Sequence, residues 1–324
     1  MTLRSVGRGL LLLLAAVAVA APLLAPNDPN QLFADRVYAP PSRVHLRDES
    51  GFRAPFVYRQ TLDNRLLRTY RNDRAAPVAL SWFSGGRVVT AGGGDGSLLV
   101  LGADALGRDI FSRLLYGARW SLGVAALGAL VGGMAGTFGG RTDSVLMTTA
   151  DFLLVLPGAY LVLVLRAALP LVLSRGEVFW LMALLFSAAG WPHVARGVRA
   201  IVATERQRDY AEAARAAGAG RFRLMRQLVP ASRGFLAVEA VLLVPALLVA
   251  EATVSYLGLG FPEPTPSWGT MLQDAANVGL LVDAPWMLAP AAALFVAVLA
   301  VHLAGGSHAP ERALLTGRLT SSHS

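Results

Sequence analysis

Residues 209–218 read Asp-Tyr-Ala-Glu-Ala-Ala-Arg-Ala-Ala-Gly and form a charged, alanine-rich stretch between strongly apolar segments. Alanine and arginine favour a helix, and glycine readily ends one in a left-handed conformation. We predict a helix over residues 204–217 that Gly218 ends, followed by a second short helix that runs to Pro230. The two helices together would form a compact knob on a membrane protein.

The composition places the chain in a lipid bilayer. Of its 324 residues, 54% are hydrophobic and only 15% are charged, whereas charged residues approach about a quarter of a soluble domain. All 29 basic residues are arginine, and the absence of lysine excludes a Walker A phosphate loop, a Schiff-base lysine and a lysine general base. The absence of cysteine excludes disulfides, thiol catalysis and cysteine metal sites, and the five histidines show no His-Glu-x-x-His type of spacing. The net charge of +8 comes from arginines beside apolar runs, so no nucleic-acid partner is expected.

Six apolar runs approach the roughly 20 residues that a helix needs to cross a membrane. They cover about residues 9–26, 120–140, 145–171, 178–194, 235–257 and 284–305. We therefore expect an all-α integral membrane protein with six transmembrane helices. Four charged residues fall in or near these runs, and each should lie near an interface or face protein because charge in hydrocarbon is costly. They are Asp151, Arg166, Glu239 and Glu251.

The short connections indicate which ends of the helices face the cytoplasm. Between the fourth and fifth runs nine arginines outnumber three acidic residues, whereas the connection between the fifth and sixth runs has three acidic residues and no arginine. Arginine accumulates in cytoplasmic loops, so residues 196–233 are expected there. Six spans then place both termini in the cytoplasm and residues 28–119 outside.

The expected organisation has four parts. Residues 1–27 would be the N-terminal tail and first helix, 28–119 the external segment, 120–306 the five-helix core and 307–324 a cytoplasmic tail. The first run also fits a cleavable signal that ends near Ala18-Val19-Ala20, but the apolar residues continue beyond it, which favours an uncleaved anchor. Three β-prone runs predict a small, partly β excursion in the external segment, at 57–58, 78–82 and 87–90.

Glycines recur every four residues along the second apolar run, at Gly128, Gly132, Gly136 and Gly140. Glycines at this spacing share one face of a helix and allow a neighbouring helix to approach closely. We interpret this stripe as a packing seam.

The first helix of the knob is predicted to have two different faces. Tyr210, Ala213, Ala214 and Ala217 form a nearly flat apolar face, and Arg208, Glu212 and Arg215 form a charged one. An amphipathic pair on anionic headgroups is the alternative. Such interfacial helices use leucine and tryptophan, whereas a flat alanine face suits insertion into a protein cleft.

The sequence resembles the permease subunits of ATP-binding-cassette importers, specifically the C-type subunits of the dipeptide, oligopeptide and nickel branch. The knob is similar to their EAA loop, on the residues Asp209, Tyr210, Ala211, Glu212, Ala213, Ala214, Gly218 and Pro230. Two external motifs extend the resemblance over about residues 101–303. They are the stretch 101–119, with Gly107, Arg108 and Asp109, and the stretch 255–269, with Gly258, Gly260, Pro266, Ser267, Trp268 and Gly269.

The sequence departs from the family pattern in two places. The interval from Gly218 to Pro230 is about one residue shorter than is usual in this branch, with Gln227 where histidine is common. Residues 305–310 stand where a Gly-Asp-Gly-Leu-Arg type of ending is usual.

The resemblance implies a type I importer permease fold and alternating access. The knob would sit in a cleft on a separate ATPase subunit and act as a lever when two such subunits close. The implied partners are two ATPase subunits, a second homologous permease, an extracytoplasmic solute-binding protein and membrane lipid. The chain would bind no cofactor itself and carry out no catalysis, ATP with magnesium being bound by the partners, and it would lie in a bacterial-type inner membrane.

Two other classes of function make different demands on the sequence. An ion-gradient-driven secondary transporter would use carboxylates within the spans, such as Asp151 or Glu251. An intramembrane hydrolase would need a nucleophile and base, but His193 and His302 have no Gly-x-Ser-x-Gly or His-Glu-x-x-His partner. The transported solute stays open between a peptide, a nickel chelate and another small molecule.

Overall fold

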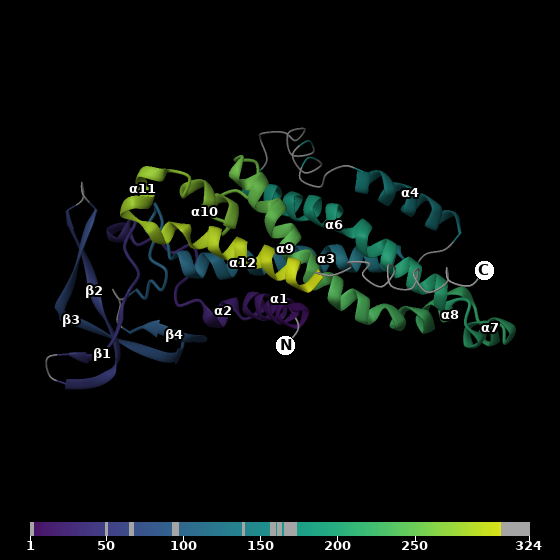
Figure 1. Ribbon diagram of the computed structural model, residues 1–324, viewed down its shortest axis with the longest axis horizontal. Helices are drawn as coiled ribbons and strands as arrows, with labels where there is room; N and C mark the ends of the chain where they lie inside the picture. The colour runs from purple at the N-terminus through teal and green to yellow at the C-terminus, as the bar shows by residue number, and fades with distance from the viewer. Residues whose placement is uncertain are drawn as a thin grey trace, which may run out of the picture.

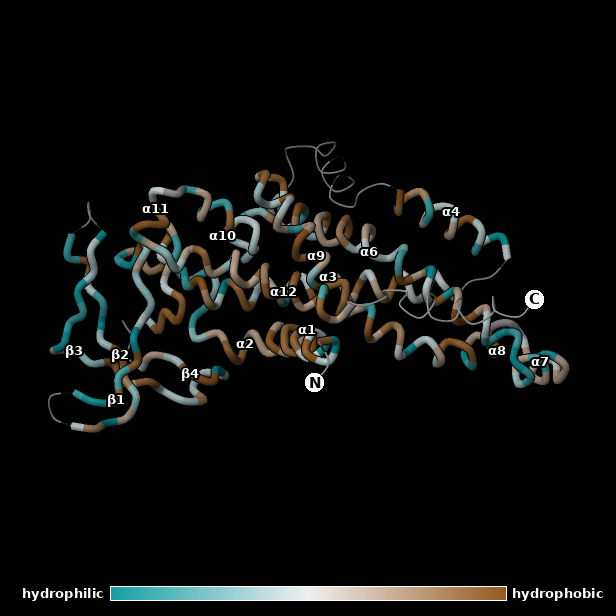
Figure 2. The backbone as a smooth tube through the Cα atoms, in the orientation of Figure 1, coloured by the Kyte–Doolittle hydropathy of each residue, from teal (hydrophilic) through white to brown (hydrophobic). Residues whose placement is uncertain are grey.

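Long helices that run side by side make an elongated bundle, with a β-sheet at one end and two short helices, α7 and α8, at the other (Figure 1). The computed structural model describes residues 3–48, 51–64, 68–92, 97–137, 140–155, 160, 164 and 174–305. Brown, apolar stretches follow the long helices, whereas teal, polar stretches are concentrated in much of the sheet and around α7 and α8 (Figure 2). This distribution fits a bundle that crosses a membrane with its polar parts at the two ends.

The longer helices are α1 (Leu3–Val19), α3 (Ile110–Ala135), α4 (Arg141–Val155), α6 (Arg175–Glu205), α9 (Arg233–Tyr256) and α12 (Ala289–Gly305). The shorter ones are α2 (Ala21–Leu24), α7 (Asp209–Ala216), α8 (Arg221–Leu228), α10 (Trp268–Asp274) and α11 (Val278–Asp283), with single 3-10 turns at Ala34–Arg36, Val229–Ser232 and Pro285–Leu288. Within the described residues, four helical segments are long and apolar enough to cross a membrane: Ile110–Ala135, Gly176–Glu205, Arg223–Tyr256 and Pro285–Ala304. The first predicted span corresponds to α1 and α2, and the third lies partly outside the described residues.

The predicted start of the second span is wrong by ten residues. The helix begins at Ile110 rather than at Trp120, because Asp109 caps it and accepts a hydrogen bond from the backbone N–H of Phe111 at 3.1 Å. The fourth predicted span is too short as well, since α6 continues through Pro192 to Glu205. Both helices extend beyond their apolar runs, and the prediction stopped short because the first turns of α3 and the last turns of α6 contain charged residues.

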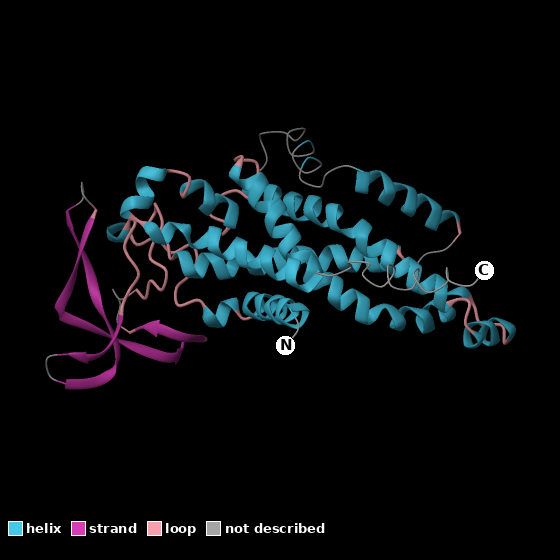
Figure 3. Cartoon of the chain, viewed as in Figure 1, coloured by secondary structure: helices cyan, strands magenta, loops and turns pink. Residues whose placement is uncertain are grey.

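The sheet contains four antiparallel strands in the order β1-β2-β3-β4 (Figure 3). Their bounds are β1 (Val44–Asp48), β2 (Gly51–Asn64), β3 (Thr69–Ser84) and β4 (Arg87–Ala91). The β-prone runs of the sequence lie in β2, β3 and β4; β2 and β3 extend well beyond their runs, whereas β4 matches its run to within one residue. A small core at the base of the sheet buries Val57, Leu80 and Leu98.

Glycines of α3 lie against the backbone of α6, as the four-residue spacing predicts. A Cβ on Gly132 would lie 2.5 Å from the Trp191 carbonyl oxygen, and one on Gly136 would lie 2.5 Å from that of Ala195. Gly128 faces the Ser187 carbonyl oxygen at 3.3 Å from its Cβ position. Gly140 does not belong to this seam, because it lies beyond the end of α3, is exposed and has a φ of +73°.

Two exposed ion pairs join α4 to α6. Asp143 accepts a hydrogen bond from Nε of Arg199 at 2.8 Å, and Asp151 pairs with Arg196. Asp151 therefore has a charged partner, as expected for an acidic residue within a predicted span. Glu251 is buried and hydrogen-bonded, Glu239 is half-buried, and Arg166 lies outside the described residues.

The seam predicts different outcomes for two alanine substitutions in the same helix. Gly132→Ala should lower the free energy of unfolding by about 1–3 kcal/mol, the usual range for overpacking, because the new methyl group meets backbone of α6. Gly123→Ala is the control, since no atom lies within 4 Å of its Cβ position. Thermal unfolding of both variants in detergent measures the difference, and equal midpoints for the two variants would contradict the seam.

Candidate functional site

The predicted knob is present as α7 and α8 at the end of the bundle opposite the sheet (Figure 1). Gly218 follows α7 with a φ of +79°, the left-handed conformation predicted for it. The predicted start of the first helix is wrong: Thr204 and Glu205 end α6, and α7 begins at Asp209 after a turn in which Arg208 is extended. The knob is thus a direct continuation of α6, separated from it by one turn.

Polar contacts hold the turn between α6 and α7. Tyr210 donates its hydroxyl hydrogen to Glu205 at 2.7 Å, and Arg208 pairs with the same carboxylate at 3.1 Å. Arg215 reaches back from α7 and donates to the Arg206 carbonyl oxygen. These contacts fix the direction of α7 relative to the end of α6.

One apolar face of α7 is left uncovered within the described part of the chain. Tyr210 is 44% exposed, Ala213 and Ala217 are exposed, and Ala214 is half-buried. Ala211 is the residue of α7 that packs into the bundle, and it is fully buried. The apolar face that the residue spacing predicted is therefore the face of α7 that points away from the bundle.

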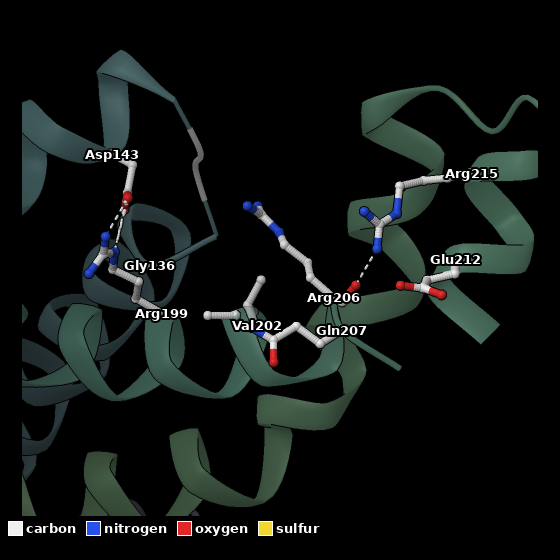
Figure 4. Close-up of a pocket in the computed structure, with 9 residues that line it drawn as sticks. Gly136, Asp143, Arg199, Val202, Arg206, Gln207, Glu212 and Arg215 are labelled. Carbon is white, nitrogen blue, oxygen red and sulfur yellow. Dashed lines mark hydrogen bonds and ion pairs between the residues drawn. The ribbon is translucent and has the colours of Figure 1, made fainter. Parts of the chain in front are cut away.

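A cavity of about 440 Å³ lies between the knob and the ends of α3, α4 and α6 (Figure 4). Its walls carry Asp143 and Arg199 on one side and Glu212 and Arg215 on the other, and the Arg206 side chain extends into the space between them (Figure 4). Arg206 also donates to the Thr137 carbonyl oxygen at 3.2 Å. One side of the knob therefore borders a cavity lined mainly by polar side chains, while Ala211 and Leu228 join it to the apolar core of the bundle.

The two external motifs meet at the opposite end of the bundle, although about 150 residues separate them. Gly107, Arg108 and Asp109 precede α3; Gly258 and Gly260 follow α9; Pro266 and Ser267 precede α10, which begins with Trp268 and Gly269. Trp268 is buried and donates its indole N–H to the Leu114 carbonyl oxygen at 2.9 Å. Gly117 makes room for that ring, since a Cβ there would lie 2.7 Å from it.

An ion network ties the start of α3 to the connection between α9 and α10. Buried Arg108 donates to Asp104 at 2.7 Å and pairs with Glu263. Arg113 is fully buried and lies 3.5 Å from Glu263 and 3.8 Å from Asp104. Removing one partner of a buried pair leaves an uncompensated charge, so this network strongly constrains how the two motifs pack.

A second polar contact joins α9 to α10. Buried Glu251 accepts hydrogen bonds from the hydroxyls of Ser255 and Ser267. Ser267 in turn caps α10 and accepts from the backbone N–H groups of Gly269 and Thr270. Glu251 is thus a satisfied buried acid with a packing role.

Asp109 is the buried acid at the start of α3. It accepts hydrogen bonds from Asn27 at 3.0 Å and from the Ser112 hydroxyl at 2.6 Å. Burial raises the pKa of Asp109 to about 6, and these hydrogen bonds oppose part of that rise. Asn27 also donates to the Leu98 carbonyl oxygen at 2.7 Å, so the cluster connects α2, the end of the sheet segment and α3.

Sequence reasoning did not predict that Asp104, Arg113 and Glu263 form an ion network at the sheet end of the bundle. It also missed the hydrogen bonds that Asn27 and Glu251 make at the same end. A charged residue followed by an apolar run is the available signal for Arg113, but nothing in the local sequence identifies its partners. Pairing across 150 residues becomes visible only when the helices are placed side by side.

Comparison with known proteins identifies the family. Residues 128–310 match the family described as binding-protein-dependent transport system inner membrane component. The chain belongs to this family. It is 32% identical over 305 residues to the di/tripeptide transport system permease protein DppC of Pseudomonas aeruginosa, which covers 91% of this chain and 82% of that protein.

Other relatives carry similar names. A putative peptide permease protein of Brucella ovis is 36% identical over 214 residues, or 63% of this chain and 69% of its own length. The oligopeptide transport system permease protein OppC of Bacillus subtilis is 38% identical over 196 residues, or 58% of this chain and 62% of its own length. The chain is therefore a membrane permease subunit of an ATP-binding-cassette importer, of the C type that its sequence resembles.

The burial of Asp109 predicts a pH-dependent stability. Its folded pKa of about 6 exceeds the ordinary value of 3.8, so the folded state keeps a proton that the unfolded chain loses between about pH 4 and pH 6. Stability should therefore fall by up to about 3 kcal/mol as pH rises through that window. Asp109→Asn should lose less stability over the window than the natural chain, as followed by thermal unfolding in detergent. An identical pH dependence in the variant would contradict this assignment.

Proposed function

We propose that this permease subunit and a second, homologous permease together form a translocation pathway for peptides, and that its knob couples the pathway to separate ATPase subunits. The observation that carries the proposal is the outward face of α7. Tyr210, Ala213 and Ala217 are exposed on a helix that directly continues α6, and no described part of the chain covers them. A flat alanine face permits close approach by a partner helix or cleft.

The knob is suited to transmit movement. Hydrogen bonds join α7 to the end of α6, and fully buried Leu228 anchors the end of α8 in the bundle core. A displacement of the knob would therefore be passed to α6 and, through the glycine seam, to α3. The cavity beside Glu212 and Arg215 leaves room for that side of α7 to move.

Roles for individual residues follow from this arrangement. Gly218 would set the angle between α7 and α8, Ala213 and Ala214 would contact the ATPase cleft, and Asp209 and Glu212 would orient the knob. Pro230 lies in the turn Val229–Ser232, where the chain passes from α8 into α9. The shortened second half of the knob still forms a complete two-turn helix, Arg221–Leu228.

The proposed topology has six transmembrane helices, with α1 and the segment that begins with α4 added to the four long apolar ones. Both termini and the knob would face the cytoplasm, because residues 196–233, from the last turns of α6 to the start of α9, include nine arginines and three acidic residues. The sheet would then lie outside, where a solute-binding protein delivers cargo. Two ATPase subunits would bind ATP with magnesium and carry out all catalysis.

Peptides are the proposed cargo because the relatives named above are described as peptide, di/tripeptide and oligopeptide permeases. The solute-binding protein would determine which peptides are transported. Purified binding protein from the same system, screened against a peptide library, would identify the cargo.

The coupling role is tested by valine substitutions at two neighbouring glycines. Gly218→Val should uncouple ATP hydrolysis from peptide uptake in reconstituted vesicles, because valine is strained at a φ of +79° and the angle between α7 and α8 must change. Gly220→Val is the matched control: its φ is −63°, and nothing lies within 4 Å of its Cβ position. We expect uptake per ATP hydrolysed to fall at least tenfold in the first variant, a cost of about 1.4 kcal/mol in coupling, and to change little in the second. Unchanged uptake with Gly218→Val, in a chain that still inserts and assembles, would count against the knob as the coupling element.

A further inference from the structure

The β3–β4 hairpin ends in a tight turn that fixes the position of its tip. Trp82 pairs with Val89 and Ser84 with Arg87, which leaves only Gly85 and Gly86 between the strands. Both glycines have positive φ, +60° and +75°, as a two-residue hairpin turn of this kind requires. The tip is therefore a two-residue turn between paired strands, with a defined position.

The base of the same hairpin is held by the small core of the sheet. Leu80 is buried with Val57 and Leu98, and Val78 and Val89 pack against them. Gly92 also donates its backbone N–H to the Ala79 carbonyl oxygen at 2.8 Å. The direction in which the hairpin projects is thus set by buried contacts.

Two large aromatic side chains near the tip are largely exposed in the described part of the chain. Trp82 is 54% exposed and Phe83 is 81% exposed. Phe83 has a φ of +52°, which is a strained conformation for an aromatic residue and interrupts the normal alternation of side chains along the strand. Both side chains can therefore be exposed although they are neighbours in the sequence.

The tip lies beside the end of a membrane helix. Arg87, the first residue of β4, donates from Nη1 to the Pro26 carbonyl oxygen at 2.8 Å. Pro26 closes the apolar run of α1 and α2, and the polar residues Asn27 and Asp28 follow it. Figure 1 shows β4 next to α2, and contacts between the two elements agree. This contact places the tip at the level where the apolar part of the bundle ends.

We propose that Trp82 and Phe83 insert into the interfacial region of the bilayer and anchor the sheet to the membrane surface beside α2. Aromatic side chains concentrate at that depth, where tryptophan can bury its ring and keep its N–H hydrated. A hairpin tip with two aromatic residues is also much smaller than the roughly 800 Å² that each partner contributes to a stable protein interface. A lipid surface fits the tip better than a protein partner does. The anchor would hold the sheet at a fixed tilt over the outer end of the bundle.

Phe52 provides an internal comparison. It is 85% exposed, but it lies at the β1–β2 connection, near the end of β1 and the start of β2, on the side of the sheet away from α2 (Figure 1). If exposure were the only criterion, Phe52 and Phe83 would be equally good candidates for membrane insertion. Position relative to the membrane distinguishes them.

Single-cysteine labelling tests the anchor directly, because the natural chain contains no cysteine. Phe83→Cys and Phe52→Cys are each labelled with a nitrobenzoxadiazole fluorophore in nanodiscs of phosphatidylethanolamine and phosphatidylglycerol, with and without doxyl-labelled lipid. Each variant changes one exposed side chain and removes no core contact. We expect the label at residue 83 to emit at shorter wavelength and to be quenched by doxyl lipid several-fold more strongly than the label at residue 52.

Emission typical of water at residue 83, with no more doxyl quenching than at residue 52, would overturn the proposal. That outcome would assign the tip to solvent or to a protein partner that the isolated permease lacks. The measurement needs no ATPase and no peptide, so it is independent of the coupling role proposed above.

Discussion

The close contact between the backbones of α3 and α6 is the interaction on which the rest of the structure depends. Because Gly128, Gly132 and Gly136 have no side chains, the backbone of α6 can approach α3 closely. Lipid tails provide no hydrophobic drive for one apolar helix to bind another, so packing at such seams is a main source of specificity. The seam fixes the position of α6 against α3. Because the knob directly follows α6, the seam also sets where the knob lies.

Ion pairs lie at both ends of the bundle, on either side of this seam. Asp143 and Arg199 join α4 to α6 near the knob, whereas Arg113, Asp104 and Glu263 lie at the sheet end of the bundle. The two motif blocks at that end share buried partners, so the first turn of α3 and the start of α10 must move together. The ion network and the polar cavity beside the knob thus lie at opposite ends of the bundle.

Much of this arrangement could be predicted from the sequence because membrane helices give a strong local signal. The apolar runs located α9 and α12 closely, the four-residue spacing identified three glycines of the seam, and Gly218 has the left-handed conformation expected from its place after an alanine-rich stretch. Helix ends were less predictable. The count of apolar residues did not take the helix-capping residue Asp109 into account, so the start of α3 was placed too late. It also ended the fourth span near residue 194, whereas α6 continues through Pro192 to Glu205. The partners of Arg113 were not predictable, since an ion pair across 150 residues leaves no local trace.

The central claim is that the outward face of α7 contacts a separate ATPase subunit, and cysteine protection tests it most directly. Ala213→Cys lies on that face, and Phe52→Cys at the opposite end of the molecule serves as the reference in a chain that has no other cysteine. Both are reacted with a maleimide in nanodiscs, with the permease alone and after assembly with its ATPase subunits. The account predicts that assembly slows labelling of residue 213 at least tenfold, equivalent to about 1.4 kcal/mol of protection, and leaves residue 52 unchanged. Equal labelling of residue 213 before and after assembly would contradict it.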